Sequence, residues 1–290
     1  MKSIIKIKTP AKINLTLEIL RKREDGYNEI QSVMQAISLY DCLTISVEDN
    51  DRQKIQISGN NKIIPYDKTN LAYVSTELYL HKAGISNKNI NIYIEKNIPV
   101  AAGLAGGSSN AAGVLFALNK LFNMLSNEEL SDLASKIGAD VNFCLHGGTQ
   151  LASSKGEILE KLNTPFLNLI VIKPKNLFIS AKEAYDKYAK LEIKPKYQAP
   201  EIMIKAILEN NPEKIALLLN NGLEEAILKD YPEILRIKNS LIEKGCINSL
   251  MSGSGPSVFG ILAKPLDFSD IDKNYEIFNV ESIDNGVIEA

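Results

Sequence analysis

A glycine-rich segment between a predicted strand and a predicted helix constrains the fold of this chain more than any other feature. Residues 99–109 read Pro-Val-Ala-Ala-Gly-Leu-Ala-Gly-Gly-Ser-Ser, with small residues on both sides of one leucine. Alternating residues at 91–95 predict the strand, and apolar residues at helical spacing from Val114 to Phe122 predict the helix. Glycines let backbone amides approach an anion closely, and a helix N-terminus adds unpaired donors. The segment therefore predicts a phosphate-binding loop, and the alternative is a tight packing turn.

The two commonest nucleotide-binding fingerprints are absent from this loop. No lysine follows its last glycine, and its glycines do not fit the pattern Gly-x-Gly-x-x-Gly. The twin serines Ser108 and Ser109 either cap the helix or contact a phosphate or its magnesium ion. A different kind of phosphate loop is therefore expected.

The remaining pattern predicts an α+β fold with two domains. The first sixty residues alternate with the two-residue period of strands, and a helix is expected at 70–83. A strand at 166–172, helices over most of 181–244, and two strands around a turn at 252–255 follow. We place the boundary near Gly156, so that residues 1–156 form a sheet-rich domain with the phosphate loop and residues 157–290 form an α/β C-terminal domain.

Composition limits the class of partner. The 290 residues carry 33 lysines and arginines against 35 acidic residues, and a net charge of -2 provides no broad cationic field for nucleic acid or an anionic membrane. The apolar runs are too short to span a membrane, and the three distant cysteines are expected to be reduced thiols. We therefore expect a soluble cytoplasmic protein, a monomer or weak homodimer, that binds a small molecule.

Two further segments point toward the same chemistry as the loop. Lys12 lies in a predicted strand between Ala11 and Ile13, where a side chain that only binds water is unexpected. The turn at 252–255, Ser-Gly-Ser-Gly, is either a plain hairpin or a ligand contact. Taken with the phosphate loop, these segments favour a protein that binds a nucleotide.

In this order and at these separations, the segments resemble the GHMP kinases, the superfamily of galactokinase, homoserine kinase and mevalonate kinase. Within that superfamily they are most similar to the kinases of 4-diphosphocytidyl-2-C-methyl-D-erythritol, which serve non-mevalonate isoprenoid biosynthesis. The resemblance extends over most of the chain, and it is carried by residues 10–15, 25–27, 31–34, 70–71, 99–112, 137–141 and 251–256.

The resemblance implies a role for each matching residue. ATP with Mg²⁺ would be the phosphoryl donor, Asp140 the general base toward the substrate hydroxyl, and Lys12 the cation that offsets charge on the transferred group. The metal ligands stay unassigned. The substrate-binding residues implied are Asn14, Tyr27, Asn28 and Tyr185, with both tyrosines stacking on cytosine. The residues implied for ATP are Asn70, Lys96, Pro99, Val100, Ala101, Ala102, Gly103, Leu104, Ala105, Gly106, Gly107, Ser108 and Ser109.

The chain departs from the family pattern at three positions. Asn28 stands where relatives usually have a histidine that bonds the cytosine edge, Asn142 replaces a common proline, and Ala105 replaces a common glycine. Asparagine still offers a donor and an acceptor, so recognition of the base is expected to survive with altered reach. The alternatives are another small-alcohol kinase of the homoserine or mevalonate type, and a nucleotide-binding regulator without catalysis.

Overall fold

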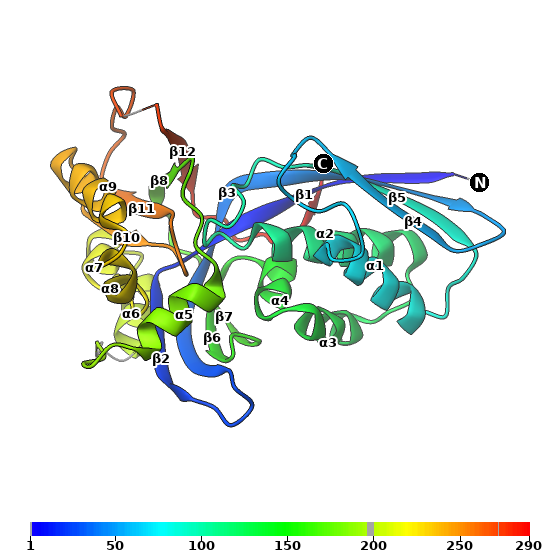
Figure 1. The fold of residues 1–290 in the computed structure, drawn as a ribbon, viewed down its shortest axis with the longest axis horizontal. Helices are drawn as coiled ribbons and strands as arrows, with labels where there is room; N and C mark the ends of the chain where they lie inside the picture. Colours follow the sequence, from blue (N-terminus) through cyan, green and yellow to red (C-terminus); the bar gives the residue numbers. More distant parts are fainter. Residues whose placement is uncertain (1, 196–199, 272) are drawn as a thin grey trace.

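The structure is a computed structural model that describes residues 2–195, 200–271 and 273–290. Its described part contains two sheets, each with helices packed against it (Figure 1). The strands are β1 (Ser3–Asn14), β2 (Thr16–Lys22), β3 (Asn28–Asp49), β4 (Lys54–Gly59), β5 (Lys88–Glu95), β6 (Thr149–Ser154), β7 (Ile158–Leu162), β8 (Asn168–Pro174), β9 (Asn220–Asn221), β10 (Asn248–Met251), β11 (Val258–Leu262), β12 (Tyr275–Glu281) and β13 (Ile288–Glu289). The helices are α1 (Leu71–Lys82), α2 (Gly106–Phe122), α3 (Asn127–Ile137), α4 (Ala139–His146), α5 (Ala181–Ala189), α6 (Pro200–Leu208), α7 (Pro212–Leu217), α8 (Glu224–Leu228) and α9 (Pro232–Glu243).

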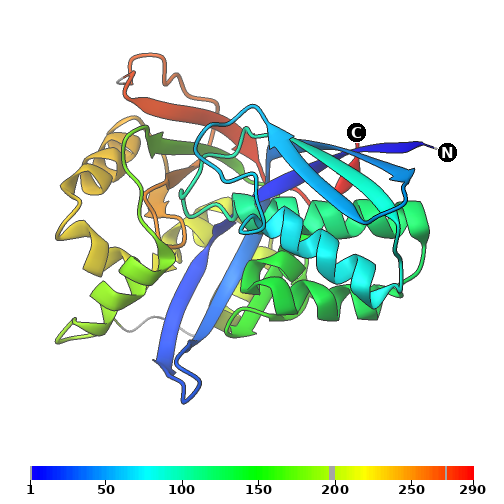
Figure 2. The same ribbon diagram turned by 45° about the vertical axis from the view of Figure 1, so that its right-hand side comes forward.

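The 22-residue strand β3 organises the larger sheet. It pairs antiparallel with β1, β2, β5 and β6, and the path β13-β1-β3-β2-β9 crosses the sheet. From Ser38 to Glu48 its residues alternate between buried and more exposed positions, as the two-residue sequence period predicts, whereas residues 32–37 are all buried. Residues 12–14, at the end of β1, pair with residues 34–36 in the middle of β3. Figures 1 and 2 show β1 running from the N-terminus toward the smaller sheet.

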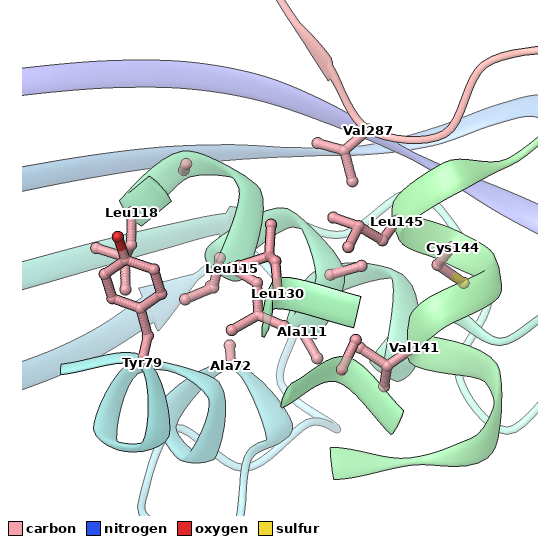
Figure 3. Close-up of a cluster of buried hydrophobic side chains, with 14 of the residues drawn as sticks. Ala72, Tyr79, Ala111, Leu115, Leu118, Leu130, Val141, Cys144, Leu145 and Val287 are labelled. Carbon is pink, nitrogen blue, oxygen red and sulfur yellow. The ribbon is translucent and has the colours of Figure 1, made fainter. Parts of the chain in front are cut away.

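Four helices, α1 to α4, share one core with the larger sheet. Tyr79, Leu115 and Leu118 lie at its centre, and Figure 3 shows them between α1 and α2. Val287, from the far end of the sequence, enters the same cluster. Burying each such side chain contributes roughly 1.5–3 kcal/mol, so this core holds the helix that follows the glycine-rich loop firmly against the sheet.

The smaller sheet, in the order β10-β11-β8-β12, is antiparallel throughout. Helices α5, α8 and α9 contribute to its core on one side. A second cluster contains Ile13 and Val33 of the larger sheet together with Val171 and Phe259 of the smaller one. Because this apolar cluster includes residues of both sheets, it fixes their relative position.

The structure confirms the α+β fold class. The predicted helix at 70–83 is α1, the predicted strand at 166–172 is β8 with a later start, and the turn at 252–255 joins β10 to β11. Helices α5 to α9 lie within residues 181–244, as expected. The boundary near Gly156 stays a prediction, because β7 still pairs with β6 of the larger sheet and β13 pairs with β1. Among the described residues, no helix has the length and apolar character needed to cross a membrane.

Candidate active site

A cavity of about 940 Å³ contains most of the residues that the sequence singled out. It extends from the start of α1, past the glycine-rich loop, to the turn between β2 and β3 and to helix α5. The predicted site residues that line it are Lys12, Asn14, Tyr27, Asn28, Asn70, Lys96, Pro99, Val100, Ala101, Ala102, Gly103, Ala105, Gly106, Gly107, Ser108, Asp140 and Tyr185. The structure therefore brings together segments that are far apart in the sequence.

The glycine-rich loop presents the N-terminus of α2 to this cavity. Ala105, in a left-handed conformation with φ 57°, is the N-cap residue, and no side chain caps the helix. Of the two alternatives for Ser108 and Ser109, capping of this helix is therefore excluded. The uncapped first-turn amides, together with the positive end of the helix dipole, form a site that suits an anion.

The turn between β10 and β11 holds the loop from the other side. The Ser252 hydroxyl donates a hydrogen bond to the Gly103 carbonyl oxygen at 3.0 Å. Gly103 has φ 74°, and a β-carbon at this position would lie 2.0 Å from the Ser252 carbonyl oxygen. Only glycine fits here, so the two glycine-containing segments are built as one packed unit.

Two residues of the loop lie away from the cavity. Ser109 is fully buried, and its hydroxyl donates to the Pro10 carbonyl oxygen at 2.7 Å. Leu104 is also buried, and its carbonyl oxygen accepts from the Lys12 amide at 3.2 Å. Both residues attach the loop to β1, and the cavity-facing serine of the pair is Ser108.

Lys12, Asn14 and Asp140 meet at the bottom of the cavity. The Lys12 ammonium lies 3.8 Å from Asp140 Oδ2 and donates to Asn14 Oδ1 at 2.7 Å. Asn14 in turn donates to the Ser32 hydroxyl at 2.8 Å, which fixes the orientation of its amide. Since Lys12 is almost fully buried and Asp140 is 31% exposed, the carboxylate is the member of the pair that a ligand can reach.

Tyr27 lies at the far end of the cavity, in the turn between β2 and β3. Its ring is exposed, and the Lys155 ammonium lies 4.8 Å from its centre. Asn28 and Tyr185 also line this end. Burial, with a smaller contribution from Asp140, raises the pKa of Tyr185 to about 12, so its phenol stays neutral beside the carboxylate. Two aromatic rings on one cavity suit a flat, uncharged group.

Asn70 and Lys96, the two residues expected near adenine, have protein partners of their own. Asn70 caps α1 by accepting from the Ala72 amide at 2.9 Å, and its side-chain amide donates to the Pro65 carbonyl oxygen at 2.6 Å. Lys96 forms a buried ion pair with Asp41. Both still border the cavity, so a role in shaping it is compatible with these contacts.

Sequence reasoning missed several charged residues of the site. Lys155, Lys182 and Asp186 line the cavity, yet surface turns and helices commonly carry such residues, and nothing in their spacing marks them. Asp41 was also missed, although the pattern around it indicates a buried position. It occupies a position in phase with Leu39 and Leu43 of a strand whose alternate residues are buried.

The side chains that line the cavity limit how a metal ion could be held there. Among residues 2–195, 200–271 and 273–290, no group of three or more histidine, cysteine or acidic side chains could hold a metal by itself. Mg²⁺ usually binds through one or two carboxylates plus the phosphates of its nucleotide. Asp140 and Ser108 offer one carboxylate and one hydroxyl to the cavity, a set that fits an ion arriving with a nucleotide.

Comparisons with known proteins agree with this site. Residues 70–148 match the family described as GHMP kinases N terminal domain, and residues 203–272 match GHMP kinases C terminal. A 4-diphosphocytidyl-2-C-methyl-D-erythritol kinase of Caldicellulosiruptor saccharolyticus is 41% identical over 279 residues, covering 96% of this chain and 94% of that protein. The enzyme of the same name from Clostridium tetani is 44% identical over 259 residues, covering 88% of this chain and 90% of its own.

Solved structures give the same result at the level of the fold. A crystal structure of 4-(cytidine 5'-diphospho)-2C-methyl-D-erythritol kinase superposes with a TM-score of 0.74 at 29% identity, covering 97% of this chain and 99% of that one. A homoserine kinase from Cytophaga hutchinsonii shares the fold, with a TM-score of 0.73 at 21% identity over 100% of this chain and 98% of its own. The chain therefore belongs to the GHMP kinases, in the family of the 4-diphosphocytidyl-2-C-methyl-D-erythritol kinases.

Proposed function

We propose that this protein transfers the γ-phosphoryl group of ATP to the 2-hydroxyl of 4-diphosphocytidyl-2-C-methyl-D-erythritol. Membership of the GHMP kinases implies ATP-dependent phosphotransfer, and the relatives' names supply the acceptor. The observation that supports the proposal most is the Lys12–Asp140 pair, 3.8 Å apart and bordering the same cavity as the uncapped N-terminus of α2. A base, a cation and an anion site in one cavity are what phosphoryl transfer to an alcohol needs.

Asp140 is the proposed general base. Its carboxylate faces the cavity from the first turn of α4 and accepts the proton of the acceptor hydroxyl as that oxygen attacks the phosphorus. The Lys12 ammonium lies beside the carboxylate and offsets the charge that develops on the transferred group. Asn14, oriented by Ser32, holds the Lys12 ammonium in position beside Asp140 and the transferred group.

The acceptor is proposed to bind at the end of the cavity that contains Tyr27, Asn28 and Tyr185. The two aromatic rings stack on the cytosine, and the Asn28 side chain offers one donor and one acceptor to the edge of the base. Stacking contributes roughly 1–3 kcal/mol per base, which is enough to select an acceptor that carries a base over a simple alcohol.

ATP is proposed to place its phosphates at the loop formed by residues 99–108, with Asn70 and Lys96 bordering the nucleotide. Mg²⁺ is part of this proposal, and when bound it neutralises phosphate charge. Ser108 and Asp140, which both line the cavity, would be the side chains that hold it. A cytoplasmic location and a monomeric or weakly dimeric state stay predictions.

A panel of acceptors incubated with labelled ATP tests this function. The cytidine-bearing acceptor, its uridine analogue, homoserine and mevalonate are supplied separately, and the labelled product is measured. We expect phosphorylation of the cytidine-bearing acceptor at least about tenfold faster than of either simple alcohol, because neither alcohol can engage the aromatic rings. Preferred phosphorylation of homoserine or mevalonate would replace this assignment with another small-alcohol kinase. No phosphorylation of any acceptor, with ATP binding intact, would favour a regulator.

A further inference from the structure

Asp41 of β3 is a fully buried carboxylate at the centre of the protein. A carboxylate without partners in such a place would be very unfavourable, because burial removes its hydration. Asp41 does not line the cavity, so no ligand replaces that hydration. Its partners must therefore come from the protein, and their positions indicate what the residue is for.

Four donors surround Asp41, and all of them come from the two segments that flank the glycine-rich loop. The backbone amides of Asn97 and Ile98 donate to Oδ1 at 2.7 and 2.8 Å. The Asn110 side-chain amide donates to Oδ2 at 2.7 Å, and the Lys96 ammonium pairs with the same oxygen. Residues 96–98 precede the loop, and Asn110 lies in α2 just after it. One carboxylate thus joins both ends of the loop.

The Lys96 ammonium lies directly behind the loop. A β-carbon placed on Gly106, the first residue of α2, would be 2.6 Å from Lys96 Nζ. The Lys96 side chain is 3% exposed, and it still borders the cavity. The loop has no lysine after its last glycine, so Lys96 brings an ammonium to the phosphate site from the strand side instead.

Asp41 also controls the charge of Lys96. Burial lowers the pKa of Lys96, and Asp41 acts in the opposite direction by charge and by hydrogen bonding. The other titratable group acting on Lys96 is the Cys144 thiol of α4, and burial raises the pKa of this thiol well above its usual range. The donors that share Asp41 with Lys96, which are the Asn97 and Ile98 backbone amides and the Asn110 side chain, do not titrate.

We propose that Asp41 is a positioning residue for nucleotide binding, which fixes both ends of the glycine-rich loop and holds the Lys96 ammonium beneath Gly106. The inference rests on the proposed function in one respect: it takes the phosphates that bind at the glycine-rich loop to be those of ATP. It concerns the donor half of the site and is independent of the acceptor. Asp41 touches no substrate atom, and it acts through the loop amides and Lys96.

The variant Asp41→Asn tests this inference, because asparagine has nearly the same shape but no charge. Affinity for ATP with Mg²⁺ is measured by direct titration, and KM for the acceptor is measured at saturating ATP. We expect the Kd for ATP to rise at least about tenfold while KM for the acceptor changes less than about twofold. The control Tyr79→Phe removes a partly buried hydrogen bond to Asn119, away from the loop, and should leave both constants unchanged.

A pH series separates positioning from general destabilisation. Without Asp41 the pKa of Lys96 falls further, so in Asp41→Asn a rise from about pH 6 to about pH 9 should weaken ATP binding much more than in the parent protein. The variant Lys96→Met should bind ATP weakly with no such added pH dependence. A pH profile for Asp41→Asn that is parallel to the parent profile would contradict a role through Lys96.

The double variant Asp41→Asn/Lys96→Met covers the case in which the single variant does not fold. It buries neither charge, so it avoids the unpaired ammonium that destabilises the single variant. The proposal is wrong if either variant, the double variant or Asp41→Asn, folds and still binds ATP within about twofold of the parent protein. A parent protein that fails to bind ATP overturns the proposed function as well. If the parent protein binds ATP but does not phosphorylate the cytidine-bearing acceptor, only the proposed function is overturned.

Discussion

Replacing Asp140 with asparagine should stop turnover and leave the rest of the site almost intact. The substitution keeps the shape of the side chain in the first turn of α4 and removes its capacity to accept a proton. Lys12 loses the carboxylate 3.8 Å away but keeps its hydrogen bond to Asn14 Oδ1 at 2.7 Å. The ammonium therefore stays in place with one of its two contacts.

The expected losses of stability and of kcat follow from this geometry. Two unit charges about 4 Å apart interact by about 4 kcal/mol at an effective dielectric constant of about 20. Because Asp140 is 31% exposed, water screens the pair, and the free energy of unfolding should fall by only about 1 kcal/mol. Loss of a general base lowers kcat by about 10²- to 10⁴-fold. Catalysis should thus suffer far more than stability.

The assay compares kcat, the Kd for ATP and the free energy of unfolding for Asp140→Asn and for the control Asp132→Asn. Asp132 is an exposed carboxylate of α3, outside the cavity. We expect ATP affinity to stay within about threefold for both variants and turnover to fall only in the first. Turnover of Asp140→Asn within about tenfold of the parent value would refute the assignment of the base.

Three other perturbations test separate parts of the structure. Tyr27→Ala should raise KM for the acceptor about tenfold or more and leave KM for ATP unchanged, because a stacked base contributes roughly 1–3 kcal/mol; equal effects on both constants would contradict stacking. Gly103→Ala should lower the free energy of unfolding in urea by about 2 kcal/mol or more, because its β-carbon would lie 2.0 Å from the Ser252 carbonyl oxygen. The matched change Gly107→Ala, whose nearest new neighbour is 3.9 Å away, should cost much less. His146 is exposed, yet partial loss of hydration, with a smaller contribution from the Lys161 charge, lowers its pKa, so the unfolded chain binds a proton more readily and stability should fall slightly as the pH drops below about 6.5. His146→Gln should flatten that part of the stability profile, and an unchanged slope would exclude this residue as its cause.

The local parts of the site were predictable from the sequence. The strand, the glycine-rich loop and the helix at 88–122 follow from periodicity and from the positions of glycine, and the structure contains all three. The rotation of the helix was not predictable at single-residue precision. Ser108 faces the cavity and Ser109 faces β1, because adjacent helical residues point about 100° apart.

The contacts between distant segments were outside the reach of pattern reasoning. Lys12 and Asp140 were paired only through the family resemblance, since no periodicity relates a residue of β1 to one of α4. The Asp41 cluster was missed for the same reason, because its donors come from two segments far from Asp41 in the chain. The carboxylate at a core position of β3 was visible, but only the fold shows which groups surround it.

The pairing of β13 with β1 has a consequence for how the chain is made. During synthesis the edge of β1 at Ile7 and Lys8 has no partner until Ile288 and Glu289 have emerged from the ribosome. An open strand edge is a template for unwanted association between nascent chains. A fragment ending at Gly156 would keep that edge exposed and would lack Val287 from its core. This edge of the larger sheet is therefore completed only by the last residues of the sequence.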